Sequence, residues 1–340
     1  MSTKHLGKQT VRLGYPPSVA AGACVVGKKE GQGPLRDWFD YISDDSYFGE
    51  KSWEKAESTM LKQCFSLACD KAKTPPSEID YLFAGDLLNQ CTGSSFALRD
   101  SGRPTFGLYG ACSTMAESLS LAAMTIDGGF ADITAAMTCS HFCSAERQFR
   151  FPLEYGGQRT PTSQWTVTGA GAIILTAEGP GPYVTHITTG KMVDAGITDA
   201  NNMGAAMAPA AYDTLKAHFE DTGRSPDYYD AIVTGDLGRL GHRIVNQFFL
   251  DDGIDLGPRF MDCGILIYAV DAQDVHAGGS GCGCAASVLC GHLLRGMTEN
   301  RWPRLLFCAT GALMSTTTVQ QGESIPGICH AVALEMQRGC

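Results

Sequence analysis

The stretch Phe106-Gly-Leu-Tyr-Gly-Ala-Cys-Ser-Thr-Met115 decides how the rest of the chain is interpreted. It predicts a short apolar strand that ends at Tyr109, a tight turn at Gly110, and an apolar helix that begins near Met115. Cys112 therefore lies at the junction of strand and helix, where the positive end of the helix dipole lowers the pKa of a thiol. A reactive thiolate is one interpretation, and a small buried cysteine in a tight turn is the other.

Composition narrows the classes of protein that this chain can represent. Its 340 residues are enough for one large domain or two ordinary ones, and its net charge of -10 argues against a nucleic-acid partner. The 14 cysteines are scattered without a zinc-binding spacing, which indicates reduced thiols in a cytosol-like compartment. We expect no resident metal or cofactor.

No part of the sequence predicts a membrane-spanning segment or a signal peptide. A span needs about 20 consecutive apolar residues, and no run in the chain approaches that length. The apolar segment 18–27 follows a basic N-terminus, but it ends in Lys28-Lys29 and consists mostly of Ala, Gly and Val. It predicts a first strand and turn, so any role at a membrane would be peripheral.

The second half of the chain repeats the first at an offset of 150 residues. Asp230-Ala-Ile-Val-Thr-Gly-Asp-Leu237 copies Asp80-Tyr-Leu-Phe-Ala-Gly-Asp-Leu87. Other matching segments are the predicted helices 54–72 and 205–221 and the apolar strands 131–139 with 304–310 and 169–176 with 328–335. A duplicated α/β half predicts two mostly parallel mixed sheets in a layered αβαβα arrangement, with halves at 1–180 and 181–340.

The same offset pairs Cys112 with Asp262. Further along, the segment Gly278–Ser287 resembles the opening of the Cys112 helix, after an insertion. A pseudo-twofold axis would bring the Cys112 helix, the Asp262 loop and the Gly281-Cys282 turn toward one centre. We therefore expect Cys112 and Asp262 to share one ligand pocket.

The turn Ala111-Cys-Ser113 resembles the nucleophile turn of the thiolase and ketoacyl-synthase superfamily. Longer motifs resemble the stage V sporulation protein AD family of spore-forming bacteria. These motifs are Ala84-Gly-Asp-Leu-Leu-Asn-Gln90, Gly110-Ala-Cys-Ser-Thr114, Ala145-Glu-Arg-Gln-Phe-Arg150, Glu154-Tyr-Gly-Gly157, Gly196-Ile-Thr-Asp199, Ala205-Ala-Met-Ala-Pro-Ala-Ala211, Asp262-Cys-Gly264 and Ala277-Gly-Gly-Ser-Gly-Cys282.

This resemblance implies a thiolase-like fold and a function in sporulation. It implies binding of dipicolinic acid, alone or with calcium, and a part in the uptake of that acid into the developing spore. Other stage V A proteins are the implied partners, and the implied place is the periphery of the spore inner membrane. Thiolase-like proteins usually form homodimers through a strand near the nucleophile turn, and the apolar segment 133–139 is the expected seam.

The resemblance leaves open whether the protein is an enzyme. Thiolases and ketoacyl synthases use the cysteine as a nucleophile that histidine helps to activate. The matching segments here, Thr234-Gly-Asp-Leu237 and Gly281-Cys-Gly283, supply no histidine. A non-catalytic binding protein is the first hypothesis. The alternatives are an acyl-transfer enzyme that uses Cys112 with His141 or Asp236 as the base, and a structural subunit of a membrane assembly.

Dipicolinic acid is a flat ring with two carboxylates, so its site needs anion donors and an apolar wall. The helix after Cys112 offers a favourable dipole, and Gly281 permits close approach of the backbone. Arg147 either pairs with a carboxylate of the ligand or is held by Glu146 and Glu154. The candidate ligand-binding residues are Cys112, Asp262, Cys282, Gly281, His141, Thr234, Asp236 and Arg147.

Overall fold

The computed structural model describes residues 4–149 and 159–338. Within these ranges the main sheet follows the order β11-β10-β13-β14-β9-β2-β8-β6-β4-β5. Outside this order, β1 pairs with β9 and β3 pairs with β2. This path divides into two halves that meet at a single pairing between Ser18 and Tyr183. The first half contains β2 (Ser18–Val26), β4 (Tyr81–Gly85), β5 (Thr105–Leu108), β6 (Ile133–Ser140) and β8 (Gly169–Thr176); the second contains β9 (Tyr183–Thr188), β10 (Ala231–Thr234), β11 (Phe260–Asp262), β13 (Arg304–Ala312) and β14 (Gly327–Glu335).

Both halves arrange their five strands in the same way. Counted along the chain, the order across each half is third, second, fourth, fifth, first. The third, second and fourth strands run parallel, and the fifth is antiparallel to both of its neighbours. This repeated topology confirms the predicted mixed α/β sheets. The short strands outside the repeat are β1 (Thr10–Arg12), β3 (Tyr41–Ile42), β7 (Trp165–Thr166) and β12 (Gly279–Ser280).

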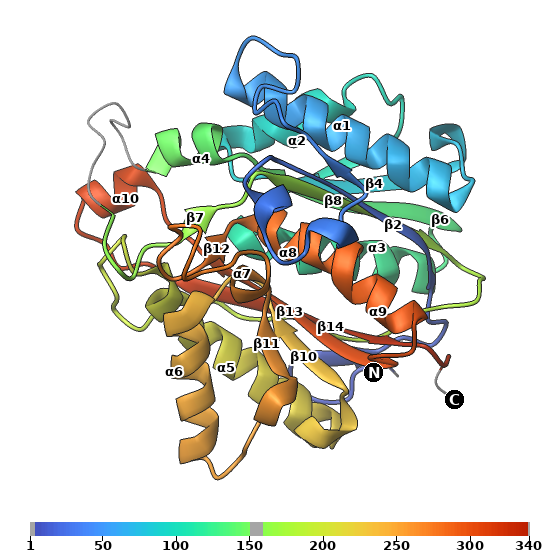
Figure 1. The fold of residues 1–340 in the computed structure, drawn as a ribbon. Coiled ribbons are helices and arrows are strands. Elements are labelled where there is room, and N and C mark those ends of the chain that lie inside the picture. Colours follow the sequence, from blue (N-terminus) through green and yellow to red (C-terminus); the bar gives the residue numbers. More distant parts are fainter. Residues whose placement is uncertain (1–3, 150–158, 339–340) are drawn as a thin grey trace.

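Helices cover the outer face of each half-sheet and fill the space between the two (Figure 1). α1 and α2 pack on the first half, α5 and α6 pack on the second, and α3 and α8 lie between them. The helices are α1 (Trp53–Ala72), α2 (Thr92–Leu98), α3 (Thr114–Asp127), α4 (Phe142–Phe149), α5 (Met203–Thr222), α6 (Gly238–Asp251), α7 (Cys263–Leu266), α8 (Cys282–Val288), α9 (Leu294–Thr298) and α10 (Thr316–Gln320). In the described ranges, none of them combines the length and apolar character needed to cross a membrane.

The aspartate that opens each copied segment has the same structural role in both halves. The Asp80 carboxylate accepts hydrogen bonds from the N–H groups of Asp132 and Ile133, where β6 begins. The Asp230 carboxylate accepts one from the N–H of Arg304, where β13 begins. In both halves the aspartate therefore aligns the start of the fourth strand with the second.

The structure corrects the expected dimer seam. The segment 133–139 belongs to β6, which is paired with β4 on one edge and with β8 on the other. Its backbone therefore has no free edge to offer a second chain. In the described part of the chain β5 pairs only with β4, and its residue Phe106 is 51% exposed. The open edge of the first half-sheet lies at β5.

Candidate functional site

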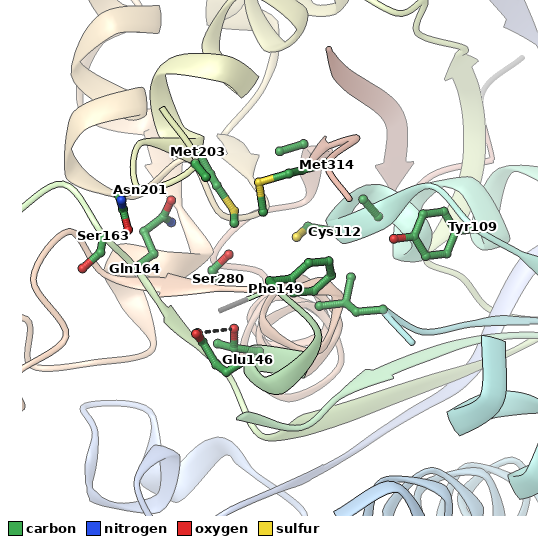
Figure 2. Close-up of a pocket in the computed structure, with 15 residues that line it drawn as sticks. Tyr109, Cys112, Glu146, Phe149, Ser163, Gln164, Asn201, Met203, Ser280 and Met314 are labelled. Atoms are coloured by element: carbon green, nitrogen blue, oxygen red, sulfur yellow. Dashed lines mark hydrogen bonds between the residues drawn. The ribbon is translucent and has the colours of Figure 1, made fainter. Parts of the chain in front are cut away.

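Cys112 lies in a short turn between β5 and α3, as the sequence predicts. The turn is a single 3-10 turn in which Ala111 takes a left-handed φ of 49°. The Ser113 hydroxyl donates to the Gly110 carbonyl at 2.6 Å and holds the turn closed. This geometry directs the Cys112 side chain into an enclosed cavity (Figure 2).

The environment of this thiol is the opposite of the one that a helix end alone predicts. Burial raises the pKa of Cys112 well above the usual range of a thiol, and the neighbouring Asp236 carboxylate raises it further. A hydrogen bond from the Gly281 backbone acts in the other direction without reversing the shift. Cys112 is therefore a neutral thiol that donates to Asp236, which favours the interpretation of a buried cysteine over that of a reactive thiolate.

Asp236 is the acidic residue that the fold places beside Cys112. It follows β10, and its carboxylate accepts hydrogen bonds from the Thr310 hydroxyl at 2.9 Å, the Ser280 hydroxyl at 3.1 Å and the Gly281 N–H at 2.9 Å. Burial raises the pKa of Asp236 to about 6, even though these donors favour the charged form. The carboxylate is thus fixed in position beside the Cys112 thiol.

Asp262, the predicted partner of Cys112, has a different role. It is the N-cap of α7, and its carboxylate accepts hydrogen bonds from three backbone N–H groups. The Thr234 hydroxyl donates to it at 2.8 Å. Neither Asp262 nor Thr234 is among the described residues that line the cavity. Asp262 lies close enough to Asp236 to raise its pKa, but its own carboxylate is taken up by backbone N–H groups and by Thr234, so the structure does not bring it into the cavity with Cys112.

An insertion explains why the repeat offset misassigned this position. In the first half, β5 leads directly through the Cys112 turn into the central helix α3. In the second half, α7 and the connection 267–278 stand between β11 and the central helix α8. The structural counterpart of the Cys112 turn is therefore the start of α8, at Gly281-Cys282.

Gly281 and Cys282 lie beside Cys112, as predicted. Gly281 has a φ of 98°, and a Cβ added there would lie 2.8 Å from the Ser140 hydroxyl, so glycine is required. Cys282 is fully buried, its thiol donates to the Cys139 carbonyl at 2.9 Å, and it packs in one cluster with Cys112. The two central helices therefore begin next to each other.

His141 does not reach this site. Its Nε2 donates to the Ser46 carbonyl at 2.8 Å, and its Nδ1 accepts from the Cys143 N–H at 3.2 Å. Burial lowers the pKa of His141, which keeps the ring neutral. It lines a separate hollow beside Trp165, so it cannot serve as the base for Cys112.

Arg147 is also outside the cavity. It forms an ion pair with Glu54 on the exposed side of α4, instead of the predicted pairing with Glu146. The Glu146 carboxylate accepts from the Thr166 hydroxyl at 2.9 Å. Glu154, the other expected partner, and Arg150 lie outside the described residues.

The cavity has one apolar wall and one polar wall (Figure 2). Phe149, Met203 and Met314 gather around the Cys112 thiol, and Asn201 and other polar residues lie at the far end. The described lining residues are Leu87, Tyr109, Ala111, Cys112, Glu146, Phe149, Ser163, Gln164, Thr166, Ala200, Asn201, Met203, Ser280, Ala312 and Met314. The inner cavity is narrow, about 40 Å³.

A wider hollow of about 430 Å³ adjoins this cavity. Phe149, Ala200 and Met314 line both spaces, so they form the partition between them. Arg147 and the residues of α10 line the outer space. One of these shared side chains, Met314, is a flexible thioether.

Sequence reasoning missed most of the polar wall. Ser163, Gln164 and Asn201 come from connections without a motif, and only folding brings them together with Cys112. Ser280 could have been predicted from the sequence, since it belongs to the glycine-rich segment that opens α8. In the part of the chain that the structure describes, no group of three or more His, Cys, Asp or Glu side chains is arranged to hold a metal ion.

The duplicated half-sheets and the cysteine turn between them define a thiolase-like protein. A 3-oxoacyl-[acyl-carrier-protein] synthase III of Aquifex aeolicus VF5 has a similar structure, with a TM-score of 0.57, 13% identity, and coverage of 94% of this chain and 99% of that one. Cerulenin-bound OleA of Xanthomonas campestris is similar as well, with a TM-score of 0.58, 16% identity, and coverage of 94% and 96%.

Sequence comparison then gives the family. The family model for stage V sporulation protein AD (SpoVAD) matches residues 7–335. The stage V sporulation protein AD of Bacillus subtilis (strain 168) is 44% identical over 336 residues, which cover 99% of each chain. The chain belongs to the stage V sporulation protein AD family, so the resemblance read from the sequence motifs is confirmed.

Proposed function

We propose that this protein is a non-catalytic binder of dipicolinic acid, alone or with calcium, that takes part in the uptake of this acid into the developing spore. One observation carries the proposal. The site at Cys112 keeps an enclosed, two-walled cavity, but a carboxylate faces the thiol and no histidine is among the described lining residues.

The protonation states oppose covalent catalysis at this site. Burial raises the pKa of Cys112 well above the usual range of a thiol, whereas the pKa of its neighbour Asp236 is about 6. Transfer of the thiol proton to this carboxylate is therefore unfavourable. A nucleophilic cysteine needs a base whose proton affinity is closer to its own.

The two walls suit a ring with carboxylates. Phe149 and Met314 offer an apolar surface for the ring, and the Asn201 side chain supplies an amide donor at the polar end. Because the inner cavity holds only about 40 Å³, the ring displaces the partition when it enters. Met314 in this partition has the rotational freedom for that movement.

Titration calorimetry with pyridine-2,6-dicarboxylate tests the proposal, with and without calcium. The natural chain should bind, and Asn201→Ala should weaken binding about tenfold, as expected for one lost hydrogen bond to a charged group. Asn300→Ala, at an exposed position outside the cavity, is the matched control and should change nothing. Absence of binding under both conditions would overturn the proposal.

An active condensing or acyl-transfer enzyme of the thiolase type is the second candidate. The observation in its favour is the hydrogen bond between Cys112 and Asp236, which gives the thiol a possible proton acceptor. Incubation with acyl-CoA followed by mass spectrometry distinguishes the two. An acyl adduct that Cys112→Ala abolishes would establish the enzyme, and the binder requires that no such adduct forms.

We also propose that the protein acts as a homodimer at the periphery of the spore inner membrane, together with other stage V A proteins. The support for the homodimer is the open edge at β5, because an exposed sheet edge is a template for pairing with another chain. Family membership supports the partners and the location.

A further inference from the structure

A carboxyl group that the Cys112 cavity does not use lies behind one of its walls. Glu57 belongs to the buried side of α1, and its side chain is fully buried. α1 and α5 each have 20 residues and begin 150 residues apart, so the repeat pairs Glu57 with Met207. Met207 is fully buried too, in an apolar cluster. The fold therefore accepts an apolar side chain at this place, and the acid in the first half has a reason of its own.

Glu57 contacts α4, a helix that forms part of the cavity wall. The Ser144 hydroxyl oxygen and the Oε2 atom of Glu57 are 2.5 Å apart, and both residues are fully buried. Glu146 and Phe149 of the same helix line the cavity. The contact with Glu57 therefore fixes a helix whose other side chains shape the cavity.

The hydrogen bonds around Ser144 indicate that Glu57 is neutral. The Ser144 hydroxyl also lies 3.1 Å from the His141 carbonyl oxygen, but it has a single proton to donate. A charged Glu57 would take that proton and leave the contact between Ser144 and His141 without one. A protonated Glu57 donates to Ser144, and Ser144 then donates to the His141 carbonyl, so both contacts are satisfied.

A second buried carboxyl group faces Glu57 across Gly93. A Cβ added at Gly93 would lie 3.2 Å from Oε1 of Glu57 and 3.3 Å from Oδ2 of Asp86. Asp86 accepts hydrogen bonds from the N–H groups of Leu88 and Ser94 and from the Ser94 hydroxyl, and these donors favour its charged form. No backbone N–H of the described residues donates to Glu57. Since two like charges so close together repel each other, the proton belongs on Glu57.

The other groups around Glu57 do not stabilise a charge on it. Burial raises the pKa of Glu57 well above the usual range of a carboxyl group, and the Asp86 carboxylate raises it further. The Cys139 thiol, 3.6 Å from Oε1, is neutral because burial raises its pKa as well. The remaining titratable groups nearby are the neutral His141, the buried Cys282 thiol, and Glu54 with Arg147, which pair with each other at the surface.

We infer that neutral Glu57 is a positioning residue for the Cys112 cavity. Through Ser144 it fixes α4 against α1, and so it sets the place of Glu146 and Phe149 in the cavity wall. A charge on Glu57 would face Asp86 and break the chain of hydrogen bonds to the His141 carbonyl, so the neutral form is the one that holds the helix. The inference rests on the proposed function only in that the ligand binds in this cavity.

Hydrogen exchange of the α4 amides, measured by mass spectrometry on the ligand-free full chain, tests the position of the helix. Glu57→Met introduces the residue that the second half carries, so the core stays filled while the hydrogen bond to Ser144 is lost. Exchange in α4 should become about fivefold faster, as expected for one lost hydrogen bond. Ser144→Ala should have the same effect. Unchanged exchange in both variants would overturn the inference, because Glu57 would then only fill space.

Two further variants separate positioning from packing. The amide of Glu57→Gln can still donate to Ser144, so this variant should exchange like the natural chain, within about twofold. Ser120→Ala is the matched control, because Ser120 is buried and its hydroxyl donates to the Ala116 carbonyl of its own helix at 2.6 Å. It should leave exchange in α4 unchanged. If Glu57→Gln loosened α4 as much as Glu57→Met, the neutral hydrogen bond would be excluded as the link.

An infrared difference spectrum between the natural chain and Glu57→Gln at pH 7 tests the proton itself. It should contain the C=O band of a protonated carboxyl group, and carboxylate bands in its place would overturn the inference. Calorimetry with pyridine-2,6-dicarboxylate then tests the consequence for the cavity: Glu57→Met should weaken binding about tenfold, and Glu57→Gln should not. Exchange and infrared spectra need no ligand, so a natural chain that fails to bind would refute the proposed function and leave these two results to decide the role of Glu57.

Discussion

At the scale of single residues, the Cys112 site shows how burial outweighs the helix dipole. A helix end contributes at most about 2 kcal/mol, whereas loss of hydration shifts buried groups by several pKa units. The sequence shows the helix end, because Ser and Thr follow the cysteine. It does not show that Asp236 will lie against the thiol, since 124 residues separate them. The direction of the pKa shift of Cys112 could therefore not be predicted from the sequence.

Asp236 should make the protein less stable as the pH rises. Its pKa is raised from 3.8 to about 6, so between these values the folded chain binds more protons than the unfolded chain. The free energy of unfolding then falls with increasing pH across this window, by up to about 3 kcal/mol from this group. Asp236→Asn should remove that part of the decline.

Urea unfolding of both chains from pH 4 to pH 7 measures the difference. Other buried carboxyl groups, such as Glu57 and Asp86, have raised pKa values too, so only the difference between natural chain and variant is informative. Asp100→Asn, at an exposed site, should run parallel to the natural chain. A parallel course for Asp236→Asn would contradict the raised pKa.

At the scale of elements, the strands were easier to predict than the way in which separate segments come together in the fold. β6, β8, β13 and β14 are buried apolar runs, and each appears where the sequence places it. The error over Asp262 arose because a fixed offset ignores the insertion of α7 before α8. The polar wall was missed because its residues come from separate connections without periodicity, and only tertiary packing brings them together.

The open edge at β5 should mediate the proposed homodimer. Phe106→Lys puts a charge on this edge, which should oppose pairing with a second chain. Phe96→Lys on α2 makes the same change at a side chain of similar exposure, 56% against 51%, and should have no effect. Sedimentation velocity at micromolar concentration should show a dimer for the natural chain and the control, and a monomer for Phe106→Lys.

At the scale of the whole molecule, the two halves share one core. The largest cluster of buried apolar residues takes Phe83 from the first half-sheet, Phe307 from the second, and Leu119 from α3 between them. Such shared burial predicts that the halves do not unfold separately. The predicted boundary between the halves 1–180 and 181–340 stays a prediction. It concerns the duplication and the topology of the two halves, and it does not imply that each half folds alone.

Gly283→Ala should test this coupling, because it disturbs the contact of a central helix with the first half-sheet. A Cβ at Gly283 would lie 2.3 Å from the Gly169 carbonyl oxygen, which is backbone and cannot easily move. We expect a loss of at least about 2 kcal/mol in a single cooperative transition. Gly107→Ala, where no atom lies within 4 Å of the added Cβ, should cost less than about 0.5 kcal/mol. Two separate transitions would show that the halves fold independently.

The contact between Cys112 and Cys282 has a consequence for how this pocket can change during evolution. Each residue marks the start of a central helical run. At the start of α8 the Gly281 N–H already donates to the Asp236 carboxylate at 2.9 Å. This donor belongs to the backbone, so a screen that replaces lining side chains one at a time would not remove it. Relatives can therefore vary the lining side chains and still inherit this donor at the same place.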